Sequence, residues 1–238
     1  MRKLIVLWFK MNLKNRIYPG ITCTSAIRNK DHWRLQLKEI NLLGIKEVAL
    51  FPTTLGIQQR KEMYQELEKS CIKKIKLVHM RGEDFTEEEM EYFYKRWKTR
   101  LFNCHEKYFD QLYKKFPKFR KNIVLELNYD NKIENKLLPK KMGGFCIDLS
   151  HIKCAKELHK LEWDYMMNHL KDTKFMANHL NGYSKNKKRD LHFVNNVKEF
   201  DYLKELPKKI FSKVIALELE NTIKEQLKFK DYIVRLMK

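Results

Sequence analysis

The chain of 238 residues has few of the features that mark secreted, modular or membrane proteins. Its five cysteines include no CxxC pair and follow no regular spacing, which argues against a disulfide framework and favours a reducing, cytoplasmic compartment. No Gly/Ser-rich linker or low-complexity block interrupts the sequence, so we expect one domain. The apolar run from Leu4 to Phe9 is too short to span a membrane and lacks a small-residue cleavage site. We therefore expect no membrane association.

Acidic side chains are also in deficit, with 30 Asp and Glu against 50 Lys and Arg, which gives a formal charge of +20. Basic side chains that neutralise phosphates gain free energy by releasing counterions. DNA or a phosphorylated sugar would fit this charge as the substrate. Lysines scattered over helix surfaces would give the same total, so the charge supports a phosphate-bearing partner without choosing one.

Short apolar runs alternate with amphipathic stretches along most of the chain, a pattern typical of repeated βα units and a parallel sheet. Eight such runs occur: Ile21 to Thr24, Glu47 to Phe51, Ile75 to His79, Arg100 to Cys104, Ile123 to Leu127, Gly144 to Asp148, Lys174 to His179 and Lys213 to Glu218. They predict an α/β fold, a single (β/α)8 TIM barrel over residues 21–238. Residues 1–20 would form an N-terminal extension or an extra strand.

The segments between these runs have helical features. Thr86 can form a capping box with Glu89, and the amphipathic stretch before Gly44 ends at a residue favoured just beyond helices. We also expect one long helix from Ala155 to Leu170, a short one from Asn131 to Leu138 and a closing one from Thr222 to Leu236.

Histidine is scarce, with eight in the chain. Five of them fall at or just beyond the predicted strand ends: His79, His105, His151, His179 and His192. In a β/α barrel the C-terminal ends of the strands meet at one mouth, where the loops assemble the active site. These five side chains are therefore expected to converge. The other three, His32, His159 and His169, fall on predicted helical segments and are expected to be surface or packing residues.

Carboxylates share this placement, since Glu126, Asp148 and Glu218 lie within or at the end of apolar runs. A carboxylate that faces the barrel interior is costly unless it is paired or binds a cation. Asp148 and His151 flank a strand-to-helix turn, and Asp190 and His192 lie on one side of an extended segment, so each pair can face one ion. Mixed oxygen and nitrogen ligands suit zinc, manganese or iron.

Together these residues resemble the superfamily that contains endonuclease IV and the xylose-isomerase-like sugar isomerases and epimerases. The resemblance covers the barrel from about Ile21 to the C-terminus. Nine residues carry it, in the expected order and on the expected strands: His79, His105, Glu126, Asp148, His151, His179, Asp190, His192 and Glu218. The chain departs from the endonuclease IV pattern after His79, where Met80-Arg81-Gly82 replaces a motif with a DNA-inserting aromatic residue.

The two branches of the superfamily imply different metal centres. The endonuclease IV pattern implies up to three zinc ions: His79, His105 and Glu126 would hold the first, Glu126 would bridge to a second shared with Asp148, His179 and Glu218, and His151, Asp190 and His192 would hold the third. The isomerase pattern implies one manganese, cobalt or magnesium ion on Glu126, Asp148, His179 and Glu218. In that scheme Glu126 and Glu218 are also catalytic, because they move a proton.

The expected function is metal-dependent hydrolysis of a phosphodiester in abasic or damaged DNA, a DNA-repair activity. Lys185, Lys187, Lys188 and Arg189 adjoin the predicted ligands, where they would either bind phosphates or form a solvated loop. The alternative is isomerisation or epimerisation of a sugar or sugar phosphate. A barrel that binds without catalysis is a third hypothesis, which the complete set of ligand types disfavours. Three zinc ions per chain would indicate the hydrolase, and one ion would indicate the isomerase.

Overall fold

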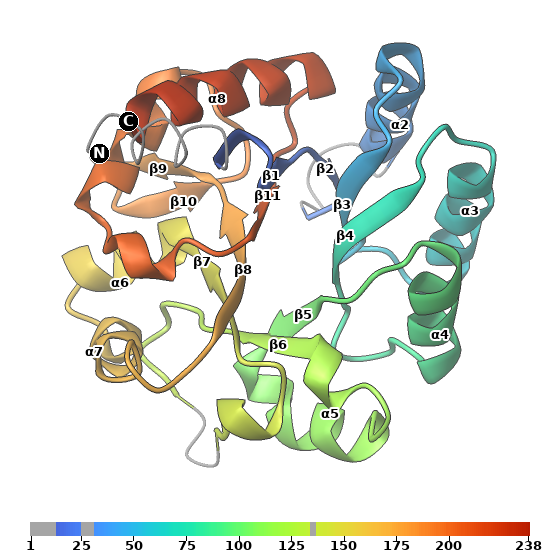
Figure 1. Ribbon diagram of the computed structural model, residues 1–238. Coiled ribbons are helices and arrows are strands. Elements are labelled where there is room, and N and C mark those ends of the chain that lie inside the picture. Colours follow the sequence, from blue (N-terminus) through green and yellow to red (C-terminus); the bar gives the residue numbers. More distant parts are fainter. Residues whose placement is uncertain (1–12, 25–30, 134–136) are drawn as a thin grey trace, which may run out of the picture.

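The computed structural model describes residues 13–24, 31–133 and 137–238, in which parallel strands form a barrel surrounded by helices (Figure 1). The main sheet contains β1 (Ile17–Tyr18), β2 (Gly20–Thr22), β3 (Glu47–Phe51), β4 (Lys74–His79), β5 (Phe102–His105), β6 (Ile123–Glu126), β7 (Phe145–Asp148), β8 (Phe175–Leu180) and β11 (Val214–Leu217). The predicted α/β barrel is thus confirmed, and each of the eight predicted runs overlaps a strand.

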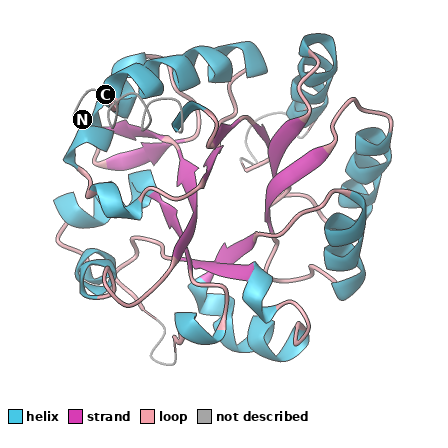
Figure 2. Ribbon diagram, in the orientation of Figure 1, coloured by secondary structure: helices cyan, strands magenta, loops and turns pink. Residues whose placement is uncertain are grey.

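Helices lie outside the ring of strands (Figure 2). The α-helices are α2 (His32–Leu43), α3 (Ile57–Glu68), α4 (Glu87–Arg96), α5 (Phe109–Lys115), α6 (Leu149–Glu157), α7 (Leu161–Asn168) and α8 (Ile223–Leu236). Short 3-10 helices span Glu106–Tyr108, Arg120–Asn122, Pro139–Lys141, Val197–Glu205 and Lys208–Ile210. None of the helices in the described ranges is both long and apolar enough to cross a bilayer.

The ring of strands closes through the first strand, which Pro19 divides into β1 and β2. Ile17 of β1 pairs with Ile215 of β11, and Gly20 of β2 pairs with Ala49 of β3. A β-carbon at Gly20 would lie 2.0 Å from the backbone oxygen of Leu217, so glycine is needed at this close approach. The strand begins at Ile17, within the segment that the sequence assigned to an extension or extra strand, and residues 1–12 lie outside the described part.

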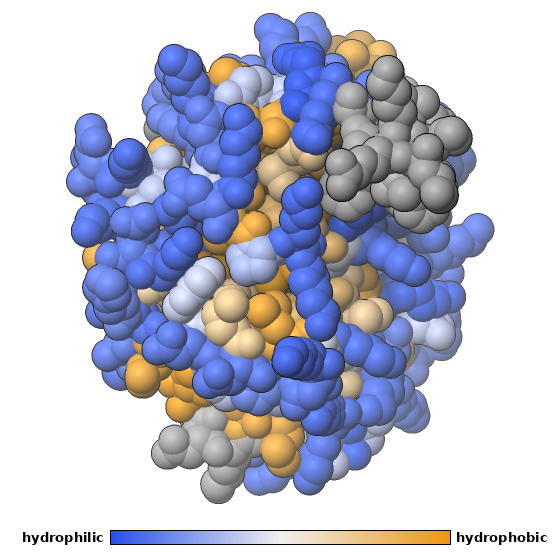
Figure 3. All heavy atoms as spheres, turned by 60° about the vertical axis from the view of Figure 1, so that its left-hand side comes forward, coloured by the Kyte–Doolittle hydropathy of each residue, from blue (hydrophilic) through white to orange (hydrophobic). Residues whose placement is uncertain are grey.

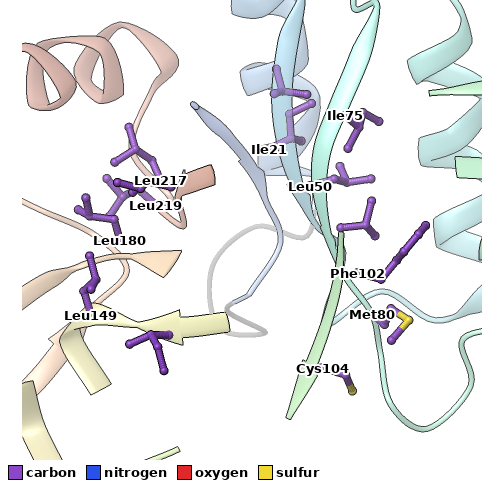
Figure 4. Close-up of a cluster of buried hydrophobic side chains, with 14 of the residues drawn as sticks. Ile21, Leu50, Ile75, Met80, Phe102, Cys104, Leu149, Leu180, Leu217 and Leu219 are labelled. Atoms are coloured by element: carbon purple, nitrogen blue, oxygen red, sulfur yellow. The ribbon is translucent and has the colours of Figure 1, made fainter. Parts of the chain in front are cut away.

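Side chains alternate between the two faces of each strand and so build two apolar cores. The inner core fills the barrel and consists of Ala49, Phe51, Leu77, Val124, Cys146, Ala177 and Ala216. The larger outer core lies between the strands and the helices. Figure 4 shows part of it, with Ile21, Leu50 and Ile75 from three neighbouring strands. Both cores are buried, with exposed fractions of 8% or less. Burial of one face fixes the strand register and so the direction of the strand side chains at the barrel mouth.

Local signals set several helix ends as predicted. The Thr86 hydroxyl accepts a hydrogen bond from the Glu89 backbone N–H, and the Glu89 carboxylate accepts one from the Thr86 N–H. Gly44 ends α2 in the left-handed conformation, with φ of 65°. The closing helix α8 begins after Thr222, which forms a second capping box with Glu225. These caps satisfy backbone groups that a helix end leaves without partners.

Two predicted helices are wrong. The segment from Ala155 to Leu170 forms two helices, α6 and α7, because the chain turns between them and His159 adopts a positive φ of 52°. The segment from Asn131 to Leu138 is not helical in residues 131–133 and 137–138, whereas residues 134–136 lie outside the described part. The side chain of Glu162 holds this loop in place instead, since its carboxylate accepts a hydrogen bond from the backbone N–H of Lys132.

A two-stranded antiparallel hairpin stands outside the main sheet and was not predicted as such. It consists of β9 (Gly182–Ser184) and β10 (Arg189–Leu191), joined by a turn over residues 185–188. Its β10 strand confirms the extended segment expected at Asp190. The hairpin follows β8, so it projects from the C-terminal mouth of the barrel.

Polar side chains dominate the outer surface. Figure 3 shows the face formed by the left-hand side of Figure 1, where hydrophilic residues surround a narrow apolar strip. Exposed apolar side chains on the α6 and α7 segment include Leu158, Leu161 and Met167, of which Leu161 is 53% exposed. Single exposed residues of this kind are normal for a protein surface.

Candidate metal centre

The strand alternation places a layer of polar side chains directly above the inner apolar core. Each of these residues comes two positions after an inner-core residue: His79 after Leu77, Glu126 after Val124, Asp148 after Cys146, His179 after Ala177 and Glu218 after Ala216. Because side chains two residues apart share a face, all five point into the barrel mouth. All five are buried, with exposed fractions of 5% or less.

Glu126 lies at the middle of this layer. Its Oε2 atom is 3.2 Å from Nε2 of His79 and accepts a hydrogen bond of 2.8 Å from the amide of Asn103. Its Oε1 atom is 3.4 Å from Nδ1 of His179 and 3.8 Å from Nδ1 of His151. The two oxygens of one carboxylate therefore face different sets of imidazoles, an arrangement suited to bridging two ions.

His179 occupies a fully buried position beside Glu126. Its Nδ1 atom lies 3.1 Å from Oε2 of Glu218, and its ring meets that of Phe51 edge to face at 5.0 Å. Within the described residues neither ring nitrogen has a hydrogen-bond partner. Buried polar atoms are nearly always satisfied in proteins, so an imidazole with two unsatisfied nitrogens beside two carboxylates is the chemistry expected of a metal ligand.

Asp148 uses its two oxygens for different purposes. Oδ1 caps the start of α6 by accepting the backbone N–H groups of Ser150 and His151. Oδ2 accepts the amide of Asn181 at 2.7 Å and lies 3.7 Å from Nε2 of His151. The helix start thus fixes the carboxylate while one oxygen still faces the mouth.

A second polar cluster adjoins the first on the hairpin side. Oδ2 of Asp190 lies 3.1 Å from Nε2 of His192 and 4.0 Å from Nε2 of His151. Oδ1 of Asp190 accepts a hydrogen bond of 2.7 Å from the Tyr129 hydroxyl, and the Tyr129 ring lies 4.9 Å from that of His151. His151 therefore lies between the Asp148 and Asp190 carboxylates.

His105 adjoins the layer on the opposite side. Its ring lies 5.3 Å from that of His79, and its Nδ1 atom is buried with no hydrogen-bond partner among the described residues. Burial lowers the pKa of His105 to about 4, so the ring is neutral near pH 7, the form that binds metal. His79 is oriented by a contact of 3.0 Å from Nδ1 to the backbone oxygen of Met80, which leaves Nε2 toward Glu126.

Six of the nine predicted ligands meet in three overlapping groups whose ligand atoms lie within 4.8 Å of one another. The groups are His79 with Glu126 and His179, Glu126 with Asp148 and His151, and Asp148 with His179 and Glu218. These buried groups can hold a metal ion, and their mixed nitrogen and oxygen donors fit a transition metal better than calcium. His105, Asp190 and His192 adjoin the groups without belonging to one.

Neighbouring charged groups in this layer shift one another's pKa values. Burial opposes ionisation of Glu126, but its interactions with the surrounding histidines, His179 first among them, together outweigh burial and hold the pKa of Glu126 well below its usual value. Burial also opposes protonation of His179, yet the neighbouring Cys146 thiol and the carboxylates of Glu126 and Glu218 together outweigh burial and raise the pKa of His179 well above its usual value. Burial lowers the pKa of His192, but the hydrogen bond to Asp190 and the charges of Glu218, Asp190 and Asp148 together raise it to about 10. The field of the mouth is therefore negative enough to attract cations.

The four predicted phosphate-binding residues lie on the hairpin. Lys185, Lys187 and Lys188 occupy its turn, Arg189 begins β10, and all four side chains are exposed. Asp190 follows directly on the same strand, so the basic turn adjoins the polar cluster at the mouth. The hairpin brings positive charge next to a site whose own side chains are acidic.

Three residues that touch the predicted ligands escaped the sequence analysis: Asn103, Asn181 and Tyr129. The alternation of side chains along a strand could have predicted the two asparagines, because each lies two positions from a predicted ligand on the same face. Asn103 precedes His105, and Asn181 follows His179. Tyr129 gave no such signal, because it lies in a loop whose path depends on the whole barrel.

Comparison with known proteins adds no further constraint. No protein-family model matches the chain, and no curated protein is similar enough in sequence to be matched. The fold and the site therefore define its class: a β/α barrel with a buried cluster of imidazoles and carboxylates at the C-terminal mouth that can hold metal.

Proposed function

We propose that the protein is a divalent-metal-dependent phosphodiester hydrolase that acts on abasic or damaged DNA. The observation that carries the proposal is the placement of Glu126, which belongs to two of the three groups of ligand atoms. Adjacent ions bridged by a carboxylate are typical of enzymes that cleave phosphate esters. Zinc is the metal that the donor set favours, because imidazole and carboxylate both bind it well.

Under this proposal His79, His105 and one oxygen of Glu126 would hold one ion, and Asp148, His179 and Glu218 would hold its neighbour. In support, Oε2 of Glu126 lies 3.2 Å from Nε2 of His79, and Asp148, His179 and Glu218 form one of the three groups of ligand atoms. His151, Asp190 and His192 form the outermost set. When bound, the ions would stabilise the negative charge that develops on phosphate oxygens and activate the attacking water.

The protein's own groups would orient these ligands and position the substrate. The amide N–H groups of Asn103 and Asn181 hold Glu126 and Asp148 in fixed orientations, as hydrogen-bond partners of metal ligands do. The Phe51 ring closes the layer from below and excludes water from His179. The exposed lysines of the hairpin turn would bind phosphates of the nucleic acid and so place the scissile bond over the mouth.

A second candidate is a single-metal isomerase or epimerase of sugars or sugar phosphates. This candidate is favoured because His105, Asp190 and His192 belong to none of the three groups of ligand atoms. The residues of the isomerase pattern all belong to them: Glu126, Asp148, His179 and Glu218. In that scheme Glu126 and Glu218 would act as proton carriers on either side of His179, the residue that both of them approach. The metal would be manganese, cobalt or magnesium.

Metal content and substrate together separate the two candidates. The protein would be stripped with chelator, reloaded with zinc or manganese and analysed for ions per chain. It would then be assayed on DNA with one abasic site and on a panel of aldose and ketose phosphates. We expect two or three zinc ions per chain and cleavage of the DNA that chelator abolishes.

Two variants make this test specific. Glu126→Gln removes the shared ligand charge and should abolish cleavage, whereas Glu66→Gln, on the exposed face of α3, should leave it unchanged. One ion per chain together with turnover of a sugar phosphate would contradict the hydrolase proposal and support the isomerase. A chain that binds no divalent ion would contradict both.

A further inference from the structure

We propose that Tyr129 is a positioning residue that prepares the outermost ligand set, His151 with Asp190 and His192, to hold an ion of its own. The inference rests on the proposed function, because it concerns the same metal centre. Tyr129 donates a hydrogen bond of 2.7 Å to Oδ1 of Asp190 and packs its ring on His151. One side chain thus contacts two of the three ligands in the outer set.

The need for such a residue follows from where Asp190 lies. Glu126 and Asp148 are carried by strands of the barrel, whose hydrogen-bonded neighbours fix them on both sides. Asp190 is carried by β10, which pairs with β9 in a separate two-stranded sheet. The barrel ladder therefore does not set the position of this carboxylate, and contacts from outside the hairpin must do so.

Tyr129 supplies that contact from the barrel itself. It follows the β6 strand, which carries Glu126, by three residues and reaches across His151 at the start of α6. The Tyr129 hydroxyl donates its hydrogen bond to Oδ1 of Asp190, so Oδ2 remains to face His192 and His151. The phenol thereby selects which carboxylate oxygen is presented at the mouth.

Other contacts anchor the hairpin on both sides of Asp190. Before β9, the Tyr202 hydroxyl donates a hydrogen bond to the backbone oxygen of Asn181, and the Tyr183 ring packs on that of Tyr202. The backbone oxygen of His192 accepts the N–H of Glu220 at 2.7 Å, and the backbone of Val194 exchanges hydrogen bonds with the Asn221 side chain. These contacts position the backbone of the hairpin, whereas the Asp190 carboxylate is oriented by Tyr129 at Oδ1 and by His192 at Oδ2. Hydrogen-bond partners that orient metal ligands are typically worth about 10-fold to 100-fold in affinity.

The test compares Tyr129→Phe with a matched control. Tyr129→Phe keeps the ring on His151 and removes only the hydroxyl. Tyr165→Phe makes the same change at a half-buried tyrosine whose ring stacks on His169 at 4.2 Å, outside the metal centre. Metal-free samples would be titrated with zinc by equilibrium dialysis and with cobalt by visible absorption, which reports each ion's coordination separately.

We expect Tyr129→Phe to weaken the most loosely held ion by about 10-fold to 100-fold and to leave the tighter ions unchanged, whereas Tyr165→Phe should match the wild type. If Tyr129 acts through Asp190, adding Tyr129→Phe to an Asp190→Asn protein should change ion binding no further. Wild-type affinities in Tyr129→Phe would overturn the inference, and so would additive effects in the double variant. A merely structural role would lower the thermal midpoint while the ion affinities stayed the same. A wild-type chain that binds no ion would instead overturn the proposed function along with it.

Discussion

Nδ1 of the buried His179 lies 3.1 Å from Oε2 of Glu218, yet the pair lacks the geometry of a hydrogen bond. The two atoms belong to one of the groups whose ligand atoms lie within 4.8 Å of one another. The pairing places an imidazole nitrogen beside a buried carboxylate, an arrangement that a shared cation stabilises.

Substitution of Glu218 by Gln should weaken ion binding without unfolding the protein. The change removes one ligand charge but preserves the shape of the side chain, so we expect at least a tenfold loss of affinity, which corresponds to about 1.4 kcal/mol. Calorimetric titration with zinc measures the loss. Glu66→Gln on α3 is the control, and equal affinities in the two variants would show that Glu218 is not a ligand.

Metal loading should raise thermal stability, because an ion that binds only the folded chain shifts the unfolding equilibrium. At an ion concentration of 100 times the dissociation constant the gain is about 2.7 kcal/mol for one site. For a chain of this size such a gain raises the midpoint by roughly 5 to 10 °C. Differential scanning calorimetry with zinc and with chelator checks this, and an unchanged midpoint would exclude tight binding.

Ion affinity should increase with pH between 6 and 8. The pKa of His179 is raised well above its usual value by the neighbouring Cys146 thiol and the carboxylates of Glu126 and Glu218, which together outweigh burial, so an ion must displace a proton there. Each displaced proton makes the apparent affinity rise about tenfold per pH unit. Titrations in buffers of different ionisation enthalpy count the protons released. Affinity that is constant over this range would contradict the assignment of His179.

The raised pKa of His179 also affects the stability of the metal-free protein, which should fall as the pH rises. A histidine whose folded pKa is raised contributes its full stabilisation below its unfolded pKa of about 6.5. That contribution is lost as the pH rises through the raised pKa of His179. The chelated protein should therefore lose denaturant stability above neutral pH, which urea titrations at several pH values would measure.

Substitution of Gly20 by Ala should destabilise the barrel where it closes. The new β-carbon would lie 2.0 Å from the backbone oxygen of Leu217, and a strand oxygen cannot move aside as a flexible side chain can. Overpacking of this kind costs about 3 kcal/mol or more in the free energy of unfolding. Gly56→Ala is the control, because its β-carbon would meet nothing closer than 3.8 Å. Similar urea midpoints for the two variants would contradict closure through β2.

Removal of charge from the hairpin turn should weaken binding to DNA in a salt-dependent way. Each phosphate contact contributes about 0.9 to the slope of log affinity against log salt on duplex DNA. The double variant Lys185→Ser with Lys187→Ser should therefore reduce that slope by about 2. Lys224→Ser with Lys228→Ser, both exposed on α8, should leave it unchanged. Equal slopes would mean that the turn does not contact the phosphates.

The sequence by itself determined the barrel, its eight strand positions and the placement of chemical groups at the strand ends. These features depend on local periodicity, and an alternation of two residues carries His79, Glu126 and His179 to the same face wherever the strands lie. Capping signals such as Thr86 with Glu89 are equally local, because a helix end is satisfied by residues three positions away.

Only the tertiary structure decided how the barrel closes and which atoms approach one another. Ile17 pairs with Ile215 from the other end of the chain, and no local pattern specifies such a partner. The break at His159 and the loop held by Glu162 follow from packing that overrides helical periodicity. Tyr129 reaches Asp190 because the loop after β6 meets the β9–β10 hairpin over the mouth. Contacts between distant residues are set by the shared core, which is a property of the whole chain.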